Sequence, residues 1–153
     1  MTRTWPAWSL RVAVFVFPLL FLLVIYGCGG ESNFHNGMIK VTMLIEMDEK
    51  DVRWFRDVEV PNGTNGYELT EKVTDGYLES TYYPSLRAHF VQGLFGKGNS
   101  DSKYWSIYVW SESENKWEPI PVGVDLYSLK DGHVLAWYHM SADGSDKFPS
   151  ATP

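Results

Sequence analysis

The sequence predicts one α+β domain, in which a sheet packs on a single short helix. Several stretches alternate apolar and polar residues with the period of two that marks half-buried strands. Only residues 65–77 show the spacing of an amphipathic helix, and no second helical pattern follows. About 126 residues remain beyond the apolar N-terminus, which is enough for one hydrophobic core.

The first predicted strand covers residues 38–47. One face carries apolar side chains, namely Ile39, Val41, Met43, Ile45 and Met47, and the other carries Lys40, Thr42 and Glu46. Residues 48–51 form a charged turn, and residues 52–60 form a second strand that ends at the Pro-Asn-Gly of residues 61–63. This half of the domain is therefore expected to be a hairpin.

The predicted helix begins at Asn65. Glu68 follows three residues later, as in a capping box. Leu69, Val73 and Tyr77 recur every four residues and predict the buried stripe, and Gly76 is the expected terminator.

The remaining strands are predicted at residues 86–94, 104–110 and 134–139, with a turn at 96–102. The tail, residues 141–153, is polar and contains two prolines. We expect it to be disordered, and the domain proper to span residues 38–140.

The N-terminus has the character of a secretion signal. Arg3 and Arg11 flank an uncharged apolar stretch at residues 12–26, which is shorter than the ~20 residues of a membrane-spanning helix. The Gly27-Cys28 junction resembles a bacterial lipobox. We expect residues 1–27 to be a lipoprotein signal peptide, Cys28 to carry the lipid, and residues 28–37 to be a tether. The alternative is an uncleaved membrane anchor with an incidental cysteine; both place the domain outside the cytoplasm, in a bacterial envelope at the outer membrane or cell surface.

Composition excludes several kinds of site. The net charge is −6 and Lys and Arg do not cluster, which argues against nucleic acid as a partner. Cys28 is the sole cysteine, so no internal disulfide can form. His133 and His139 stand roughly 20 Å apart at ~3.3 Å per strand residue, His35 is in the tether, and His89 is expected to be solvated beside Arg87. With no nucleophile motif either, the sequence predicts no enzyme, no metal site and no required cofactor.

Aromatic residues give the strongest indication of binding. On strand 104–110, Trp105, Ile107 and Val109 form the better core face. Tyr108 and Trp110 face the other way, where they are expected either to offer a platform for a flat ligand or to pack beneath the following loop. Trp117 lies in an otherwise polar loop. It is expected either to contact a ligand or to fold over the edge strand of its own sheet, and both possibilities stay open.

A set of short motifs in a fixed order covers residues 66–139. They are residues 90–97 (Phe-Val-Gln-Gly-Leu-Phe-Gly-Lys), Tyr104-Trp105, Pro121-x-Gly123-Val124 and Tyr127-x-x-Lys130-Asp131-Gly132. The segment resembles the C-terminal β-domain of the transcobalamin and intrinsic-factor cobalamin carriers and of their small bacterial and archaeal relatives. It departs from them in the loop 111–116, which is longer than usual. The resemblance implies a β-grasp-like arrangement of the mixed sheet.

The resemblance also implies a ligand. In the carriers, the loop that corresponds to residues 111–122 closes over one face of the corrin ring, and Pro121, Gly123 and Val124 align with the family pattern. Together with the aromatic candidates, the expected ligand-binding set is Tyr108, Trp110, Trp117, Pro121, Gly123 and Val124. The carriers' helical domain is missing from this chain, so a transporter or another surface protein is the expected partner that completes the site.

We therefore expect a lipid-anchored, non-catalytic module that captures cobalamin or a related corrinoid for uptake. The alternative is a cell-surface interaction or scaffold domain that keeps the fold without the ligand.

Overall fold

The computed structural model describes residues 37–153. The predicted signal peptide, the predicted lipidation site Cys28 and most of the predicted tether lie outside the described residues. Within residues 37–153 no helix has the length and apolar character needed to cross a membrane.

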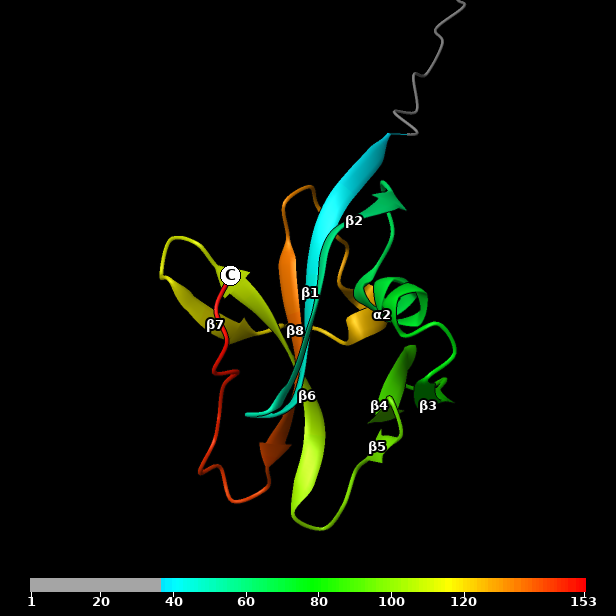
Figure 1. Cartoon of the computed structure of the whole chain (residues 1–153). Coiled ribbons are helices and arrows are strands. Elements are labelled where there is room, and N and C mark those ends of the chain that lie inside the picture. Colours follow the sequence, from blue (N-terminus) through cyan, green and yellow to red (C-terminus); the bar gives the residue numbers. More distant parts are fainter. Residues whose placement is uncertain (1–36) are drawn as a thin grey trace, which may run out of the picture. The chain divides into compact units, whose positions relative to one another are not determined.

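The main sheet has five strands in the order β2-β1-β8-β6-β7 (Figure 1). Their bounds are β1 Met38–Asp48, β2 Asp51–Pro61, β6 Lys103–Ser111, β7 Lys116–Pro119 and β8 Val134–Ser141. The central pair, β1 and β8, is parallel, and the other neighbours are antiparallel. The chain therefore forms a mixed sheet around a strand pair that is distant in sequence.

A second, three-stranded sheet follows the helix. Helix α2 spans Gly66–Thr74, and the sheet has the order β3-β4-β5, with β3 Leu78–Tyr83, β4 Ala88–Leu94 and β5 Lys97–Gly98. A short 3-10 helix, η1, spans Val124–Leu126. The predicted α+β class is confirmed for the described residues. The prediction missed β3, because its sequence Leu-Glu-Ser-Thr-Tyr-Tyr lacks a clear apolar alternation and most of its side chains are exposed.

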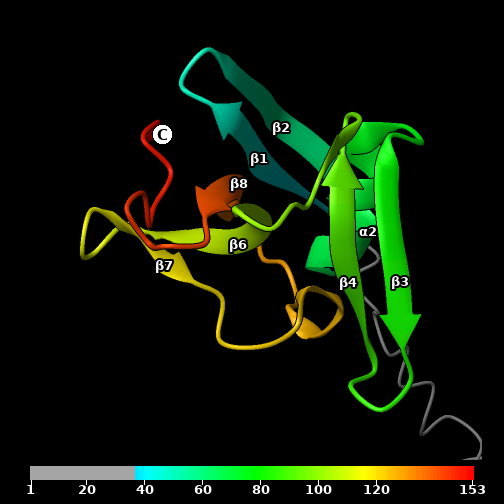
Figure 2. The same ribbon diagram turned by 90° about the horizontal axis from the view of Figure 1, so that it is seen from below.

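The main core lies between the main sheet and α2. The predicted apolar face of β1 is buried there with Leu69 of α2, Trp105 of β6 and Trp137 of β8. The Trp137 indole Nε1 donates a hydrogen bond to Thr70 Oγ1 over 2.9 Å, so the buried indole is paired with the helix. Figures 1 and 2 show α2 and the second sheet together on one side of the main sheet.

Helix α2 begins as the sequence predicts. Asn65 accepts a hydrogen bond from the Glu68 N–H, and the Glu68 carboxylate accepts one from the Asn65 N–H, which completes the capping box. The end differs from the prediction. Asp75 already adopts a left-handed conformation, with φ of 48°, and Gly76 follows it with φ of 88°. Because the chain turns there, Tyr77 leaves the helix and is exposed instead of buried.

Part of the opposite face of the main sheet is also buried. On β1 the predicted polar face is exposed at Lys40 and half-buried at Thr42, but Leu44 and Glu46 on that face are buried. Leu44, Tyr108, Trp117, Ala136 and Tyr138 form a second apolar cluster on this face. The C-terminal segment after β8 covers it (Figure 1), and Ala151 packs against it. The tail that we expected to be disordered is therefore part of the packed domain in this structure, although it forms no regular secondary structure.

Candidate functional site

The aromatic face predicted as a platform is covered by the chain itself. Tyr108 and Trp117 are both buried, and the Trp110 ring packs edge-on against Trp117 with centroids 5.2 Å apart. The Tyr108 hydroxyl donates to the Lys147 carbonyl over 2.7 Å, and Trp117 Nε1 donates to the Ala151 carbonyl over 2.8 Å. Burial raises the pKa of Tyr108, so its phenol keeps the proton it donates. The prediction that Trp117 lies in a loop is wrong, because it belongs to the edge strand β7. Of the two possibilities for its side chain, the structure shows packing within the protein, against Trp110 of β6 and the tail.

A buried carboxylate holds the tail on this face. Glu46 of β1 is 1% exposed. Its oxygens accept hydrogen bonds from the Ser150 N–H at 3.0 and 3.1 Å, the Ser150 hydroxyl at 2.7 Å and the Ala151 N–H at 3.2 Å. Carboxylates removed from water are tolerated when donors surround them in this way. The sequence could not reveal this contact, since 104 residues separate Glu46 from Ser150.

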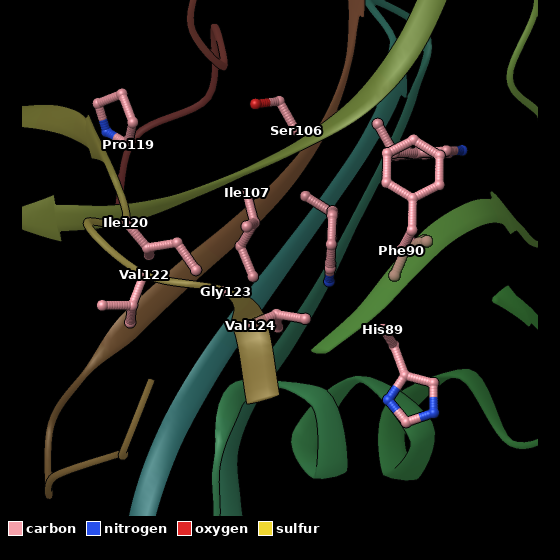
Figure 3. Close-up of a pocket in the computed structure, with 12 residues that line it drawn as sticks. His89, Phe90, Ser106, Ile107, Pro119, Ile120, Val122, Gly123 and Val124 are labelled. Atoms are coloured by element: carbon pink, nitrogen blue, oxygen red, sulfur yellow. The ribbon is translucent and has the colours of Figure 1, made fainter. Parts of the chain in front are cut away.

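The other three predicted residues lie on the opposite side of the main sheet, near a pocket. The pocket has a volume of about 270 Å³ and lies between β4, β6 and the segment 119–124 (Figure 3). Most of the lining residues are apolar, among them Phe90, Trp105, Ile107, Ile120, Val122 and Val124, but polar atoms make up nearly half of the accessible lining surface. Gly123 and Val124 belong to the lining, whereas Pro121 is exposed and lies outside it. The structure thus divides the predicted set of six between two faces.

Gly123 brings this segment close to β4. A β-carbon at Gly123 would lie 2.9 Å from the Ala88 Cβ, closer than van der Waals contact permits. Its φ of −58° is open to any residue, so the requirement for glycine here is space. The close approach places η1 beside β4 and defines one wall of the pocket.

His89 and Asp125 form a pair at the edge of the pocket that the sequence did not predict. His89 Nδ1 lies 2.6 Å from one Asp125 carboxylate oxygen, and the His89 backbone N–H donates to the other, also over 2.6 Å. The imidazole stacks on the Tyr67 ring with centroids 3.8 Å apart and an interplanar angle of 8°. His89 is therefore not the lone, solvated histidine that we expected. No local pattern could have revealed the pair, because 36 residues separate the two members.

Tyr67 belongs to α2, and a hydrogen bond to β3 holds its side chain in place. Its hydroxyl shares a hydrogen bond of 2.8 Å with the Ser80 hydroxyl of β3. Burial raises the pKa of Tyr67, and the nearby charges of Glu71 and Asp125 raise it further. The ring therefore stays neutral and offers a flat surface against which the imidazole is held.

Within residues 37–153 no three His, Cys, Asp or Glu side chains come together in a way that could hold a metal ion.

This chain resembles known proteins in structure and not in sequence. No family model matches the sequence, and no curated protein does. Haptocorrin in complex with cobinamide (Cbi) superposes with a TM-score of 0.53 over 68% of this chain, at 16% identity. A Ruminococcus gnavus protein, to which metal binding has been provisionally ascribed, also superposes with a TM-score of 0.53 over 68% of this chain, at 12% identity.

The likeness is one of fold. The matched region spans 26% of the haptocorrin chain but 98% of the Ruminococcus gnavus chain. This domain is thus similar in fold to one part of the haptocorrin chain and to almost the whole of the Ruminococcus gnavus chain. The predicted resemblance to the cobalamin carriers agrees with the haptocorrin match at the level of the fold.

Proposed function

We propose that this protein is a lipid-anchored, extracytoplasmic and non-catalytic module that binds a flat ligand of the corrinoid class. The observation that carries the proposal is the pocket beside β4 and β6, which gathers Gly123 and Val124 with the half-exposed apolar side chains of Phe90 and Val122. The fold likeness to haptocorrin, a protein solved with cobinamide, supports the choice of ligand class.

The size of the pocket determines how such a ligand binds. A volume of about 270 Å³ is at the lower limit of small-molecule sites, which usually measure ~300–1,000 Å³. A corrin ring is too large to enter it. The ring therefore lies across the mouth, with one edge or one amide substituent inside, and its far face is left for a transporter or a second surface protein to cover.

Replacement of Val122 at the mouth tests this arrangement. Val122 is 44% exposed and lines the pocket, so Val122→Asp leaves the core intact but places a charge where an apolar ring must dock. Isothermal titration calorimetry of the full-length protein in mild detergent, against cyanocobalamin and cobinamide, is expected to show saturable binding that Val122→Asp weakens at least tenfold.

Leu86→Asp is the matched control. Leu86 is 67% exposed in the turn between β3 and β4 and is not part of the pocket lining, so its replacement should leave the affinity unchanged. Absence of heat with both corrinoids at several hundred micromolar protein would reject corrinoid binding by this chain alone.

One observation favours the alternative, a surface interaction or scaffold domain without a corrinoid. Tyr108 and Trp117, which would have formed an open aromatic platform, are buried beneath the tail. The same calorimetric titrations distinguish the two functions, because a scaffold domain gives no heat with either corrinoid.

The anchor is tested at Cys28. Cys28→Ser removes the thiol that would accept the lipid, so we expect the protein to lose metabolic labelling by a radioactive fatty acid in a bacterial host. We also expect the Cys28→Ser protein to keep residues 1–27, because the signal peptide is not removed when the cysteine is absent. Labelling that persists in Cys28→Ser would contradict lipidation at this residue, and absence of labelling in the wild type would favour the uncleaved apolar anchor.

A further inference from the structure

The connection from β2 to α2 contains two Asn-Gly pairs, Asn62-Gly63 and Asn65-Gly66 (Figure 1). An asparagine before a glycine is prone to lose its side-chain amide, because the backbone nitrogen of the glycine can attack the amide carbon. Glycine favours this attack, since it has no β-carbon to hinder the approach and its backbone rotates freely. The two pairs share this local chemistry, so a large difference in their reactivity must come from the fold.

The first pair is open. Asn62 and Gly63 are both exposed and form the centre of a β-turn, which is closed by a hydrogen bond of 3.1 Å from the Thr64 N–H to the Pro61 carbonyl. A β-carbon at Gly63 would meet no other atom within 4 Å. Among residues 37–153 the Gly63 N–H has no backbone hydrogen-bond partner. The attacking nitrogen and the amide carbon are therefore both accessible, and a small rotation within the turn brings them together.

The second pair is held by the fold. Asn65 Oδ1 accepts the Glu68 N–H over 2.9 Å, which keeps the side chain turned toward the first turn of α2. The Gly66 N–H donates to the Tyr127 carbonyl over 3.0 Å, and Gly66 is buried. A β-carbon at Gly66 would lie 3.0 Å from a side-chain carbon of Val124, so the backbone has little room to rotate. Attack at Asn65 would require breaking both hydrogen bonds and opening the start of the helix.

We infer that Asn62 is a site of spontaneous deamidation in the folded protein, and that the fold protects Asn65. In the first step the Gly63 nitrogen loses its proton and bonds to Asn62 Cγ, while the bond from Cγ to the amide nitrogen breaks and ammonia leaves with that proton. A water molecule then opens the resulting succinimide at one of its two carbonyl carbons and gives aspartate or isoaspartate. One water is consumed and one ammonia is released, without oxidation or reduction.

The modification changes both the charge and the main chain of this connection. Each deamidated molecule gains one negative charge, on a chain whose net charge is already −6. In the isoaspartyl product the main chain runs through the former side chain and is longer by one methylene, directly before the Asn65 cap of α2. Asn62 is not part of the lining of the pocket beside β4 and β6, so this chemistry is independent of corrinoid binding.

Peptide mapping compares the two asparagines within one molecule. Full-length protein in mild detergent is incubated at physiological temperature and pH, and a second sample is incubated unfolded in guanidinium chloride. Trypsin releases residues 57–72 as one peptide that contains both Asn62 and Asn65, whereas the Asn-Gly pair of residues 36–37 falls in another peptide. Tandem mass spectrometry then locates the new acid, and electron-transfer fragmentation distinguishes aspartate from isoaspartate.

We expect Asn62 to convert at least about tenfold faster than Asn65 in the folded protein, and the two rates to become similar in the unfolded chain. Asn62→Gln is the matched control. Its exposed side chain should leave the fold intact, and its extra methylene disfavours the ring closure, so residue 62 should then stay unmodified while Asn65 remains protected.

Two results would overturn the inference. One is equal conversion of Asn62 and Asn65 in the folded protein, which would show that the fold does not distinguish them. The other is a folded Asn62 that stays intact over the time in which the unfolded chain reacts, which would show that the turn protects this residue as well. Tryptophan fluorescence verifies throughout that the first sample remains folded.

Discussion

Ending the chain after Asp146 is expected to lower the free energy of unfolding by about 3 kcal/mol or more. The deletion removes Ser150 and Ala151, which donate every hydrogen bond that the structure shows to the Glu46 carboxylate. Taking the partners from a buried charge costs about 3–5 kcal/mol, reduced here to the extent that water reaches the opened face. The deletion also exposes the Trp117 and Tyr108 side chains, which adds to the loss of stability. Urea unfolding followed by tryptophan fluorescence measures the change.

Two point variants test smaller parts of the contact between the tail and the main sheet. Ser150→Ala removes the hydroxyl hydrogen bond of 2.7 Å but keeps the backbone N–H donors, so it should cost only about 1–2 kcal/mol. Phe148→Ala changes a side chain that is half exposed and packs edge-on against Tyr108, so it should cost less than the deletion. If the truncated chain is as stable as the full chain, the tail does not pack on this face in solution. That result would agree with the disordered tail that the sequence predicts.

The truncated protein also tests the aromatic face as a ligand site. Without the tail, Tyr108, Trp110 and Trp117 would form the open platform that the sequence predicted. Tighter corrinoid binding by the truncated chain would assign the ligand to this face. Unchanged binding would keep it at the pocket on the other side of the sheet.

The sequence predicted the local features of this fold well. The alternation in residues 38–47 identified the buried face of β1, and Asn65 with Glu68 identified the helix start, because both signals depend on neighbours within a few residues. Strand β3 was missed because its exposed side chains lack the apolar alternation by which a strand is recognised in sequence. Tyr77 was misplaced because one left-handed residue, Asp75, ends the helix two residues earlier.

The candidate site was predictable only in part. Gly123 and Val124 could be placed through the family resemblance, and both lie at the pocket. The pairs that define the surroundings, Glu46 with Ser150 and His89 with Asp125, join residues far apart in the chain. A single sequence contains no signal for such pairs, since neither a spacing rule nor a propensity connects them.

His139 should make the protein sensitive to mild acid. It is 3% exposed on β8, and neither ring nitrogen has a hydrogen-bond partner among the described residues. Burial lowers the pKa of His139, and the positive charges of Lys103 and Lys97 lower it further, while the nearby Gly98 backbone and Asp146 oppose them. The folded state therefore holds a neutral imidazole at a pH where the unfolded chain, with a histidine pKa of about 6.5, already binds a proton.

The sign of the effect follows from proton binding. Below about pH 6.5 the unfolded state takes up more protons than the folded state, so the free energy of unfolding falls as the pH falls from there through the lowered pKa of His139. Above pH 6.5 both states are neutral at this residue and its contribution is constant. The carboxylates whose pKa values are lowered, among them Asp48 and Asp146, act in the same direction but only near and below pH 4.

Replacement by leucine isolates this residue. His139→Leu removes two unpaired polar atoms from the core, so at pH 7.5 we expect it to be neutral or to raise the free energy of unfolding by up to about 2 kcal/mol. Between pH 6.5 and 4.5 its stability should fall less steeply than that of the wild type. The slope that remains is expected from His133, whose pKa burial and Lys130 also lower, and His133→Gln in the same background should reduce it further. An unchanged slope in His139→Leu, measured by urea unfolding across this range, would show that the His139 ring reaches solvent in the folded protein and takes up its proton there.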